Sequence, residues 1–120
     1  MSEIWPSELK VSKDRRHLTV TFNDGAVASL PAEMLRVLSP SAEVQGHGPG
    51  QKVTVPGKRN VGIRQMTPTG NYAVRIGFDD GHDTGIVTWL YLRELGESGA
   101  EKFAAYEVEL AEKHLSRDPR

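Results

Sequence analysis

The chain has 120 residues, of which 38% are hydrophobic, with 15 Lys and Arg against 16 Asp and Glu. This length predicts one domain, 1–120, with its core at about 5–115. The absence of cysteine excludes disulfides, thiolate zinc sites and cysteine nucleophiles. A net charge of −1 does not attract nucleic acid or an anionic membrane. No apolar run approaches the roughly 20 residues of a membrane span, and no signal-peptide core follows Met1. We therefore expect a cytoplasmic protein.

The first third of the chain has the alternation that is typical of β-strands. Apolar and polar residues alternate in 9–11, 18–22 and 26–30, and this spacing buries one face of a strand. Asn23-Asp24-Gly25 follows the second run with residues that tolerate a positive φ. The pattern predicts a three-stranded antiparallel meander.

A short helix and a long loop follow the meander. The segment 31–38 begins with proline, which suits the first turn of a helix, and Pro40 ends it. The segment 39–59 holds four glycines and three prolines. Irregular loops of this length are functional or mobile, so we predict a mobile loop at 39–59.

The second half predicts three further strands and a helix. Apolar residues alternate in 61–66, 72–78 and 85–89, with a turn at 79–81. Glycine at 96 closes a short helical turn, and Ser98 with Glu101 forms a capping box for the last helix. We predict that this helix buries a stripe at intervals of three and four, widened by Phe103, and that 116–120 is a frayed tail. The stripe comprises Ala104, Val108, Ala111 and Leu115.

Runs of strands followed by helices favour the α+β class over a parallel sheet. We expect a mainly antiparallel β-sheet of about five to seven strands. A short helix near 31–38 and a C-terminal helix would pack on it.

The densest polar cluster is the turn 79–83, Asp79-Asp80-Gly81-His82-Asp83. Carboxylates around an imidazole suit a divalent metal or an acid/base pair, although Asp and Gly are also ordinary turn residues. The spacing does not match an EF-hand loop. The glycine-rich segment 46–52 likewise lacks the Gly-Lys-Ser/Thr ending and following helix of a phosphate-binding loop.

Four segments resemble the DUF971 family, also called the gamma-butyrobetaine hydroxylase-like N-terminal domain. They are 35–43 (LRVLSPSAE), 70–74 (GNYAV), 78–85 (FDDGHDTG) and 89–92 (WLYL). The small bacterial members of this family stand alone and have no known function. Related domains precede the catalytic domain of 2-oxoglutarate-dependent hydroxylases of the carnitine pathway, and follow Mrp-type iron–sulfur carrier ATPases in plastids.

The hydroxylase version of this domain resembles a zinc module with three cysteines and one histidine as ligands. Carried over by position, the cysteines correspond to Ser39, Ser41 and Val44, and the histidine corresponds to His82. Structural zinc requires four donors, so the resemblance implies that the zinc site is lost and that no metal or cofactor is bound. The hydroxylase activity belongs to a catalytic domain that is absent from this sequence.

These observations favour a non-catalytic binding or adapter domain whose partner is an unknown protein, linked through the family's fusions to iron–sulfur or redox-enzyme systems. The alternative is a small metal-dependent or acid/base enzyme centred on His82 and the acidic turn. We further expect Ser39, Ser41 or the adjacent backbone to hydrogen-bond His82 or its flanking aspartates in place of the metal. The candidate binding residues are His82, Asp80, Asp83, Arg36, Ser39, Ser41 and His47.

Overall fold

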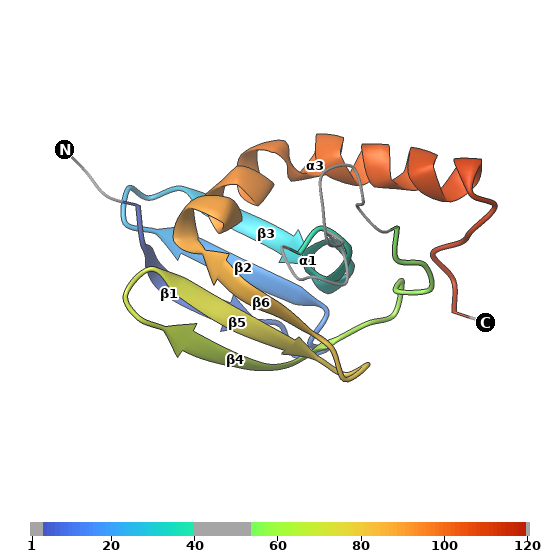
Figure 1. Ribbon diagram of the computed structural model, residues 1–120. Coiled ribbons are helices and arrows are strands. Elements are labelled where there is room, and N and C mark those ends of the chain that lie inside the picture. The colour runs from blue at the N-terminus through green and yellow to red at the C-terminus, as the bar shows by residue number, and fades with distance from the viewer. Residues whose placement is uncertain (1–3, 40–53, 120) are drawn as a thin grey trace.

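The computed structural model describes residues 4–39 and 54–119, and places six strands in two antiparallel three-stranded sheets (Figure 1). The first sheet has the order β1-β2-β3 and the second the order β4-β5-β6. This is the predicted α+β class, although the strands form two sheets instead of one. The elements are β1 (Pro6–Val11), β2 (His17–Phe22), β3 (Val27–Pro31), α1 (Ala32–Val37), β4 (Ile63–Thr69), β5 (Ala73–Phe78), β6 (Asp83–Thr88) and α3 (Trp89–Glu112).

Two tight turns of the same chemistry close the β2–β3 and β5–β6 hairpins. Gly25 has φ 90° and its N–H donates to the Phe22 carbonyl at 2.9 Å. Gly81 has φ 89° and donates to the Phe78 carbonyl at 3.1 Å. Glycine adopts this left-handed conformation without the steric penalty of a side chain. The Phe-x-Asp-Gly sequence at both positions therefore predicted both hairpins correctly.

The core lies between the two sheets and beneath α3, which runs across β3 (Figure 1). Alternate residues of β2 and β5 are buried, as the period-two pattern predicted. Both sheets, α1 and α3 contribute to one cluster of buried residues. Its almost completely buried members include Leu18, Val20, Leu30, Leu35, Ile63, Ile76, Phe78 and Leu92.

No helix in the described part of the chain combines the length and the apolar character that crossing a membrane requires.

The last helix differs from the prediction in both its start and its buried face. α3 is one helix of 24 residues, and its N-cap is Thr88, whose side chain accepts a hydrogen bond from the Tyr91 N–H at 3.1 Å. The predicted burial of Val108 is wrong, because this side chain is 58% exposed, and Ala104 and Ala111 are exposed as well. The buried residues are Leu92, Leu95, Gly99, Tyr106 and Leu110.

Two glycines inside α3 mark close approaches of the helix to its neighbours. A Cβ at Gly96 would lie 2.7 Å from the Cβ of Ala28 on β3, and one at Gly99 would lie 2.8 Å from the Met34 sulfur on α1. The Ala28 methyl moves only with its strand, whereas the Met34 sulfur lies near the end of a flexible side chain. Gly96 therefore serves close packing and does not end a helix as predicted.

We expect Gly96→Ala to lower the free energy of unfolding by about 1–3 kcal/mol, because the added methyl overpacks the α3–β3 contact. This loss would exceed the gain of about 1 kcal/mol that alanine brings to a helix interior. Adding Ala28→Gly should restore part of the loss, and Gly99→Ala should be close to neutral because Met34 can rotate. Urea denaturation measures all four proteins. A stabilising Gly96→Ala would contradict the close approach.

The ends of α3 are held by arginines. Near its start, Arg93 donates to both carboxylate oxygens of Asp24 at 3.1 and 2.9 Å, and its guanidinium lies 5.1 Å from the Phe22 ring centroid. Beyond its end, Arg117 donates to both carboxylate oxygens of Glu33 on α1 at 2.8 and 2.6 Å.

The segment after α3 also pairs with the backbone of 57–59. The carbonyls of Ser116 and Arg117 accept hydrogen bonds from the N–H groups of Gly57 and Arg59, both at 2.9 Å. The sequence predicted a frayed tail at 116–120, whereas its described part, 116–119, is held by these bonds.

Candidate functional site

The three aspartates of the acidic turn have three different surroundings. The Asp80 Oδ2 accepts hydrogen bonds from Arg36 Nε at 2.9 Å and Lys58 Nζ at 2.6 Å. The Asp83 Oδ1 accepts from the Gly85 N–H at 2.8 Å. A Cβ placed on Gly62 would lie 3.1 Å from the Asp79 Oδ2, so Asp79 faces the start of β4. The carboxylates therefore do not converge on one point, as expected for successive residues of a tight hairpin.

Arg36, Lys58 and Asp80 form a charged cluster that we call the Asp80 clasp. Arg36 is in the last turn of α1, and its side chain is only 2% exposed, while that of Asp80 is 19% exposed. A buried guanidinium requires a partner, because an uncompensated charge inside a protein is strongly unfavourable. The clasp joins α1, the segment 54–62 and the β5–β6 turn.

The clasp determines the protonation of Asp80. Partial burial by itself raises the pKa of this carboxyl, but hydrogen bonds from Lys58 and the His82 N–H and the charge of Arg36 outweigh it and lower the pKa from 3.8 to about 2. Asp80 therefore remains a carboxylate at every physiological pH. It acts as the anion of an ion pair.

This shift predicts how stability depends on pH. The folded-state pKa is lower than the unfolded one, so the contribution of Asp80 is complete above about pH 4 and is lost as the pH falls toward 2. The difference corresponds to about 2 kcal/mol. We expect the stability difference between wild type and Asp80→Asn to shrink over this range in urea denaturation. A difference independent of pH would contradict the clasp.

The structure brings some of the predicted site residues together and leaves others untested. Arg36 contacts Asp80, Ser39 is buried just beyond α1, and His82 is exposed in the turn. Ser41 and His47 lie outside the described residues. The bond expected from Ser39 or Ser41 to the turn remains a prediction. The Arg36–Asp80 pair links α1, just before Ser39, to the acidic turn.

Thr84 and Gly85, which follow the acidic turn in the family motif, hold the start of β6 in place. The buried hydroxyl of Thr84 accepts a hydrogen bond from the Ile76 N–H at 3.1 Å and donates to the Gly85 carbonyl at 2.7 Å. Gly85 has φ 71°, and the β5–β6 register shifts between Arg75 and Gly77. The Asp-Thr-Gly sequence thus supports an irregularity at the start of β6.

Two contacts that the sequence did not indicate attach the start of the segment 54–62 to α3. The Thr54 hydroxyl donates to Glu109 Oε1 at 2.9 Å, and the Tyr106 hydroxyl donates to the Val55 carbonyl. Burial raises the pKa of Tyr106 to about 12, so its phenol stays protonated as a donor. Together these bonds tie the segment that carries Lys58 to α3.

Lys58 was missed as a site residue, and the Glu33–Arg117 pair at the end of α3 was not predicted. One signal was available for Glu33 and Arg36: they are the only charged residues in the otherwise apolar segment 31–38. A short helix that buries nearly every face must pair such charges. Their partners, 84 and 44 residues further along the chain, have no local signal.

The donors at the family's zinc positions do not suit zinc. Among residues 4–39 and 54–119, no three His, Asp or Glu side chains are grouped as metal ligands. The corresponding positions supply the hydroxyls of Ser39 and Ser41, an alkyl group at Val44 and the imidazole of His82. Zinc in structural sites is held by thiolate, imidazole or carboxylate.

Comparisons with known proteins agree on one family. Residues 9–93 match the family described as gamma-butyrobetaine hydroxylase-like, N-terminal. No curated protein matches the chain. Two solution NMR structures are similar to it. The first has 47% identity and a TM-score of 0.81, and the alignment covers 96% of this chain and 90% of that one. The second has 43% identity and a TM-score of 0.80, with 96% and 87% covered.

A crystal structure from Acidithiobacillus ferrooxidans ATCC 23270 is also similar, with 38% identity, a TM-score of 0.63, and coverage of 76% of this chain and 91% of that one. It is described as a protein of unknown function in the DUF971 family. The chain therefore belongs to the gamma-butyrobetaine hydroxylase-like N-terminal family, DUF971.

Proposed function

We propose that this protein is a non-catalytic, cytoplasmic binding or adapter domain whose partner is a protein of iron–sulfur or redox-enzyme systems, and that its zinc site is lost. The observation that carries the proposal is the Asp80 clasp. Through the buried guanidinium of Arg36, it connects the acidic turn to α1, directly before the segment that the metal joins to this turn in the hydroxylase version.

The chemistry of the acidic turn supports binding over catalysis. A general acid or base works best when its pKa is near the working pH, whereas the pKa of Asp80 is about 2. The Asp83 carboxylate accepts the Gly85 N–H and so stabilises the backbone of the turn. The alternative function is a small enzyme centred on His82 and the three carboxylates of the turn. Two of these carboxylates, Asp80 and Asp83, thus have structural roles.

The proposed loss of zinc predicts no metal-dependent stabilisation. Stoichiometric Zn²⁺ should leave the Tm unchanged, in wild type and in His82→Ala alike, because one imidazole does not provide the four donors of a structural site. Differential scanning fluorimetry measures the Tm, with EDTA as the reference. A rise of several degrees that His82→Ala abolishes would refute the loss of the site.

The partner class is tested by affinity purification from the organism that encodes the chain, followed by mass spectrometry. The proposal predicts enrichment of an iron–sulfur or redox protein over a control with an unrelated domain of similar size. The purified pair should then associate in isothermal titration calorimetry. Failure to associate, or turnover of a small-molecule substrate that His82→Ala abolishes, would favour the alternative.

A further inference from the structure

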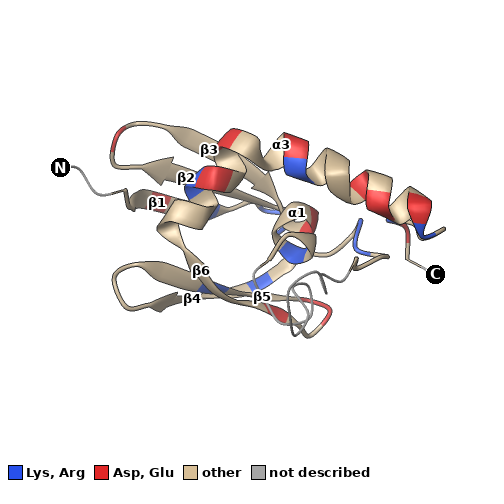
Figure 2. Cartoon of the chain, turned by 45° about the horizontal axis from the view of Figure 1, so that its top comes forward, with Lys and Arg blue, Asp and Glu red and all other residues tan. Residues whose placement is uncertain are grey.

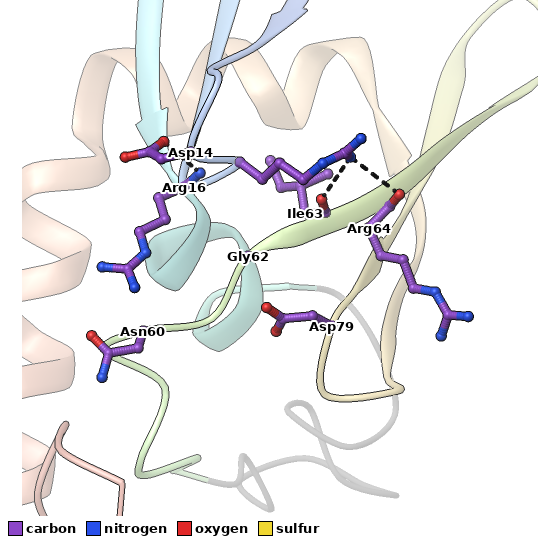
Figure 3. Close-up of a pocket in the computed structure, with 8 residues that line it drawn as sticks. Asp14, Arg16, Asn60, Gly62, Ile63, Arg64 and Asp79 are labelled. Carbon is purple, nitrogen blue, oxygen red and sulfur yellow. Dashed lines mark hydrogen bonds between the residues drawn. The ribbon is translucent and has the colours of Figure 1, made fainter.

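A second polar site lies next to the acidic turn, at a pocket of about 450 Å³ (Figure 3). Three segments far apart in the sequence form it: the β1–β2 turn, the segment leading into β4, and the first residue after β5. The lining residues are Asp14, Arg15, Arg16, Asn60, Gly62, Ile63, Arg64 and Asp79.

Backbone hydrogen bonds fix the walls of this pocket. The Ile63 N–H donates to the Arg15 carbonyl at 2.7 Å, and the Asp79 N–H donates to the Gly62 carbonyl at 3.0 Å. Arg15 has φ 63°, an uncommon value for a residue with a side chain. Its guanidinium donates to the Ile63 carbonyl at 3.2 Å. The three segments therefore keep a defined arrangement.

Gly62 keeps the middle of the pocket open. A Cβ at this position would lie 3.1 Å from Asp79 Oδ2 and 3.4 Å from the Arg15 carbonyl oxygen. Any side chain here would occupy space beside the Asp79 carboxylate. The glycine leaves that carboxylate accessible.

Three polar side chains around Gly62 have no hydrogen bond or ion pair within the described ranges 4–39 and 54–119: Arg16, Asn60 and Asp79. Figure 3 shows Arg16 and Asn60 on one side of Gly62 and Asp79 on the other, whereas Arg64 points away. A cation and an amide therefore face a carboxylate across the pocket. Each has capacity to bind a ligand.

We propose that this pocket binds a small zwitterion of the amino-acid class. Its carboxylate would pair with the Arg16 guanidinium, which suits bidentate contact, and with the Asn60 amide. Its ammonium group would pair with Asp79. Apart from Arg64, which points away, the lining carries two arginines and two aspartates, a balance that suits a zwitterion. This activity goes beyond the adapter function proposed above and does not depend on it.

Titration followed by two-dimensional ¹⁵N NMR tests the ligand class with three matched probes: L-norleucine, hexanoate, which lacks the amine, and pentylamine, which lacks the carboxylate. L-norleucine should shift the amides of Arg16, Asn60, Gly62 and Asp79, with a Kd in the millimolar range. Each of the other probes should bind about fivefold more weakly, because it loses one exposed ion pair. Equal binding of hexanoate and L-norleucine, or no shift at these amides, would overturn the proposal.

Two variants test the assigned residues, and two further variants serve as matched controls. Arg16→Gln and Asp79→Asn should each weaken L-norleucine binding about fivefold. Arg75→Gln and Glu101→Gln make the same charge changes at exposed positions outside the pocket and should leave the Kd unchanged.

Gly62→Ala should also weaken binding, because the added methyl would lie 3.1 Å from Asp79 Oδ2. The dispersion of each variant's spectrum shows that it is folded. Unchanged affinity in Arg16→Gln or in Asp79→Asn would refute this assignment.

Discussion

Leu110→Asp is expected to lower the free energy of unfolding by about 4 kcal/mol or more, whereas Val108→Asp should change it by about 0.5 kcal/mol or less. Leu110 is 4% exposed and Val108 is 58% exposed. The first substitution places an unpaired charge in the core. The second adds a carboxylate to a surface of α3 that already carries acidic residues (Figure 2).

Urea denaturation monitored by circular dichroism measures both variants. Stabilities of small domains are about 5–15 kcal/mol, so Leu110→Asp should leave a detectable unfolded fraction in the least stable case. Leu110→Asn, which is uncharged, should be less damaging than Leu110→Asp, while Val108→Asn should match Val108→Asp. Similar losses at 108 and 110 would mean that α3 packs through a different face.

The mistaken stripe in α3 has a definite physical origin. The second half of this helix carries two sets of apolar residues at intervals of three and four: one holds Ala104 and Val108, the other Tyr106 and Leu110. Periodicity alone does not choose between them. The choice follows from Leu92 and Leu95, which are buried in the same helix. Interpreting Gly96 as a helix end removed that information.

Local patterns predicted the strands, the glycine turns and the fold class correctly. Each rests on neighbouring residues: alternation in β2 and β5, and a residue able to adopt positive φ at Gly25 and Gly81. The division into two sheets was not predictable. It depends on whether a strand of the first half pairs with a strand of the second half, and those strands are far apart in the sequence. The partners of Arg36 and Glu33 were not predictable for the same reason.

In the candidate site, too, local features were predictable and long-range partners were not. The sequence identified Asp80 and Arg36 as candidate residues, but it did not indicate that they form an ion pair. Resemblance to the family suggested that the loop after α1 and the acidic turn are neighbours, and the described contact runs through α1 itself. An arginine on a short apolar helix is the feature that indicates such a partner.

Arg36→Met is expected to lower the free energy of unfolding by about 3 kcal/mol, because breaking a buried ion pair leaves the remaining charge poorly compensated. Methionine retains much of the apolar stem, so the loss reports mainly on the charge. The effect should fall at the lower end of the range for buried pairs, since Asp80 is 19% exposed and keeps Lys58. Lys58→Met, at a side chain that is 21% exposed, should lose only about 1 kcal/mol.

A double variant separates the ion pair from simple packing. Asp80→Leu added to Arg36→Met removes both charges, so the pair of substitutions should destabilise by less than the sum of the two single changes. Repeating the urea denaturation near pH 2, where half of the folded-state Asp80 is protonated, should reduce the effect of Arg36→Met. A loss that is additive and independent of pH would show that Arg36 stabilises α1 through its packing alone, and that the Asp80 clasp does not hold the two segments together.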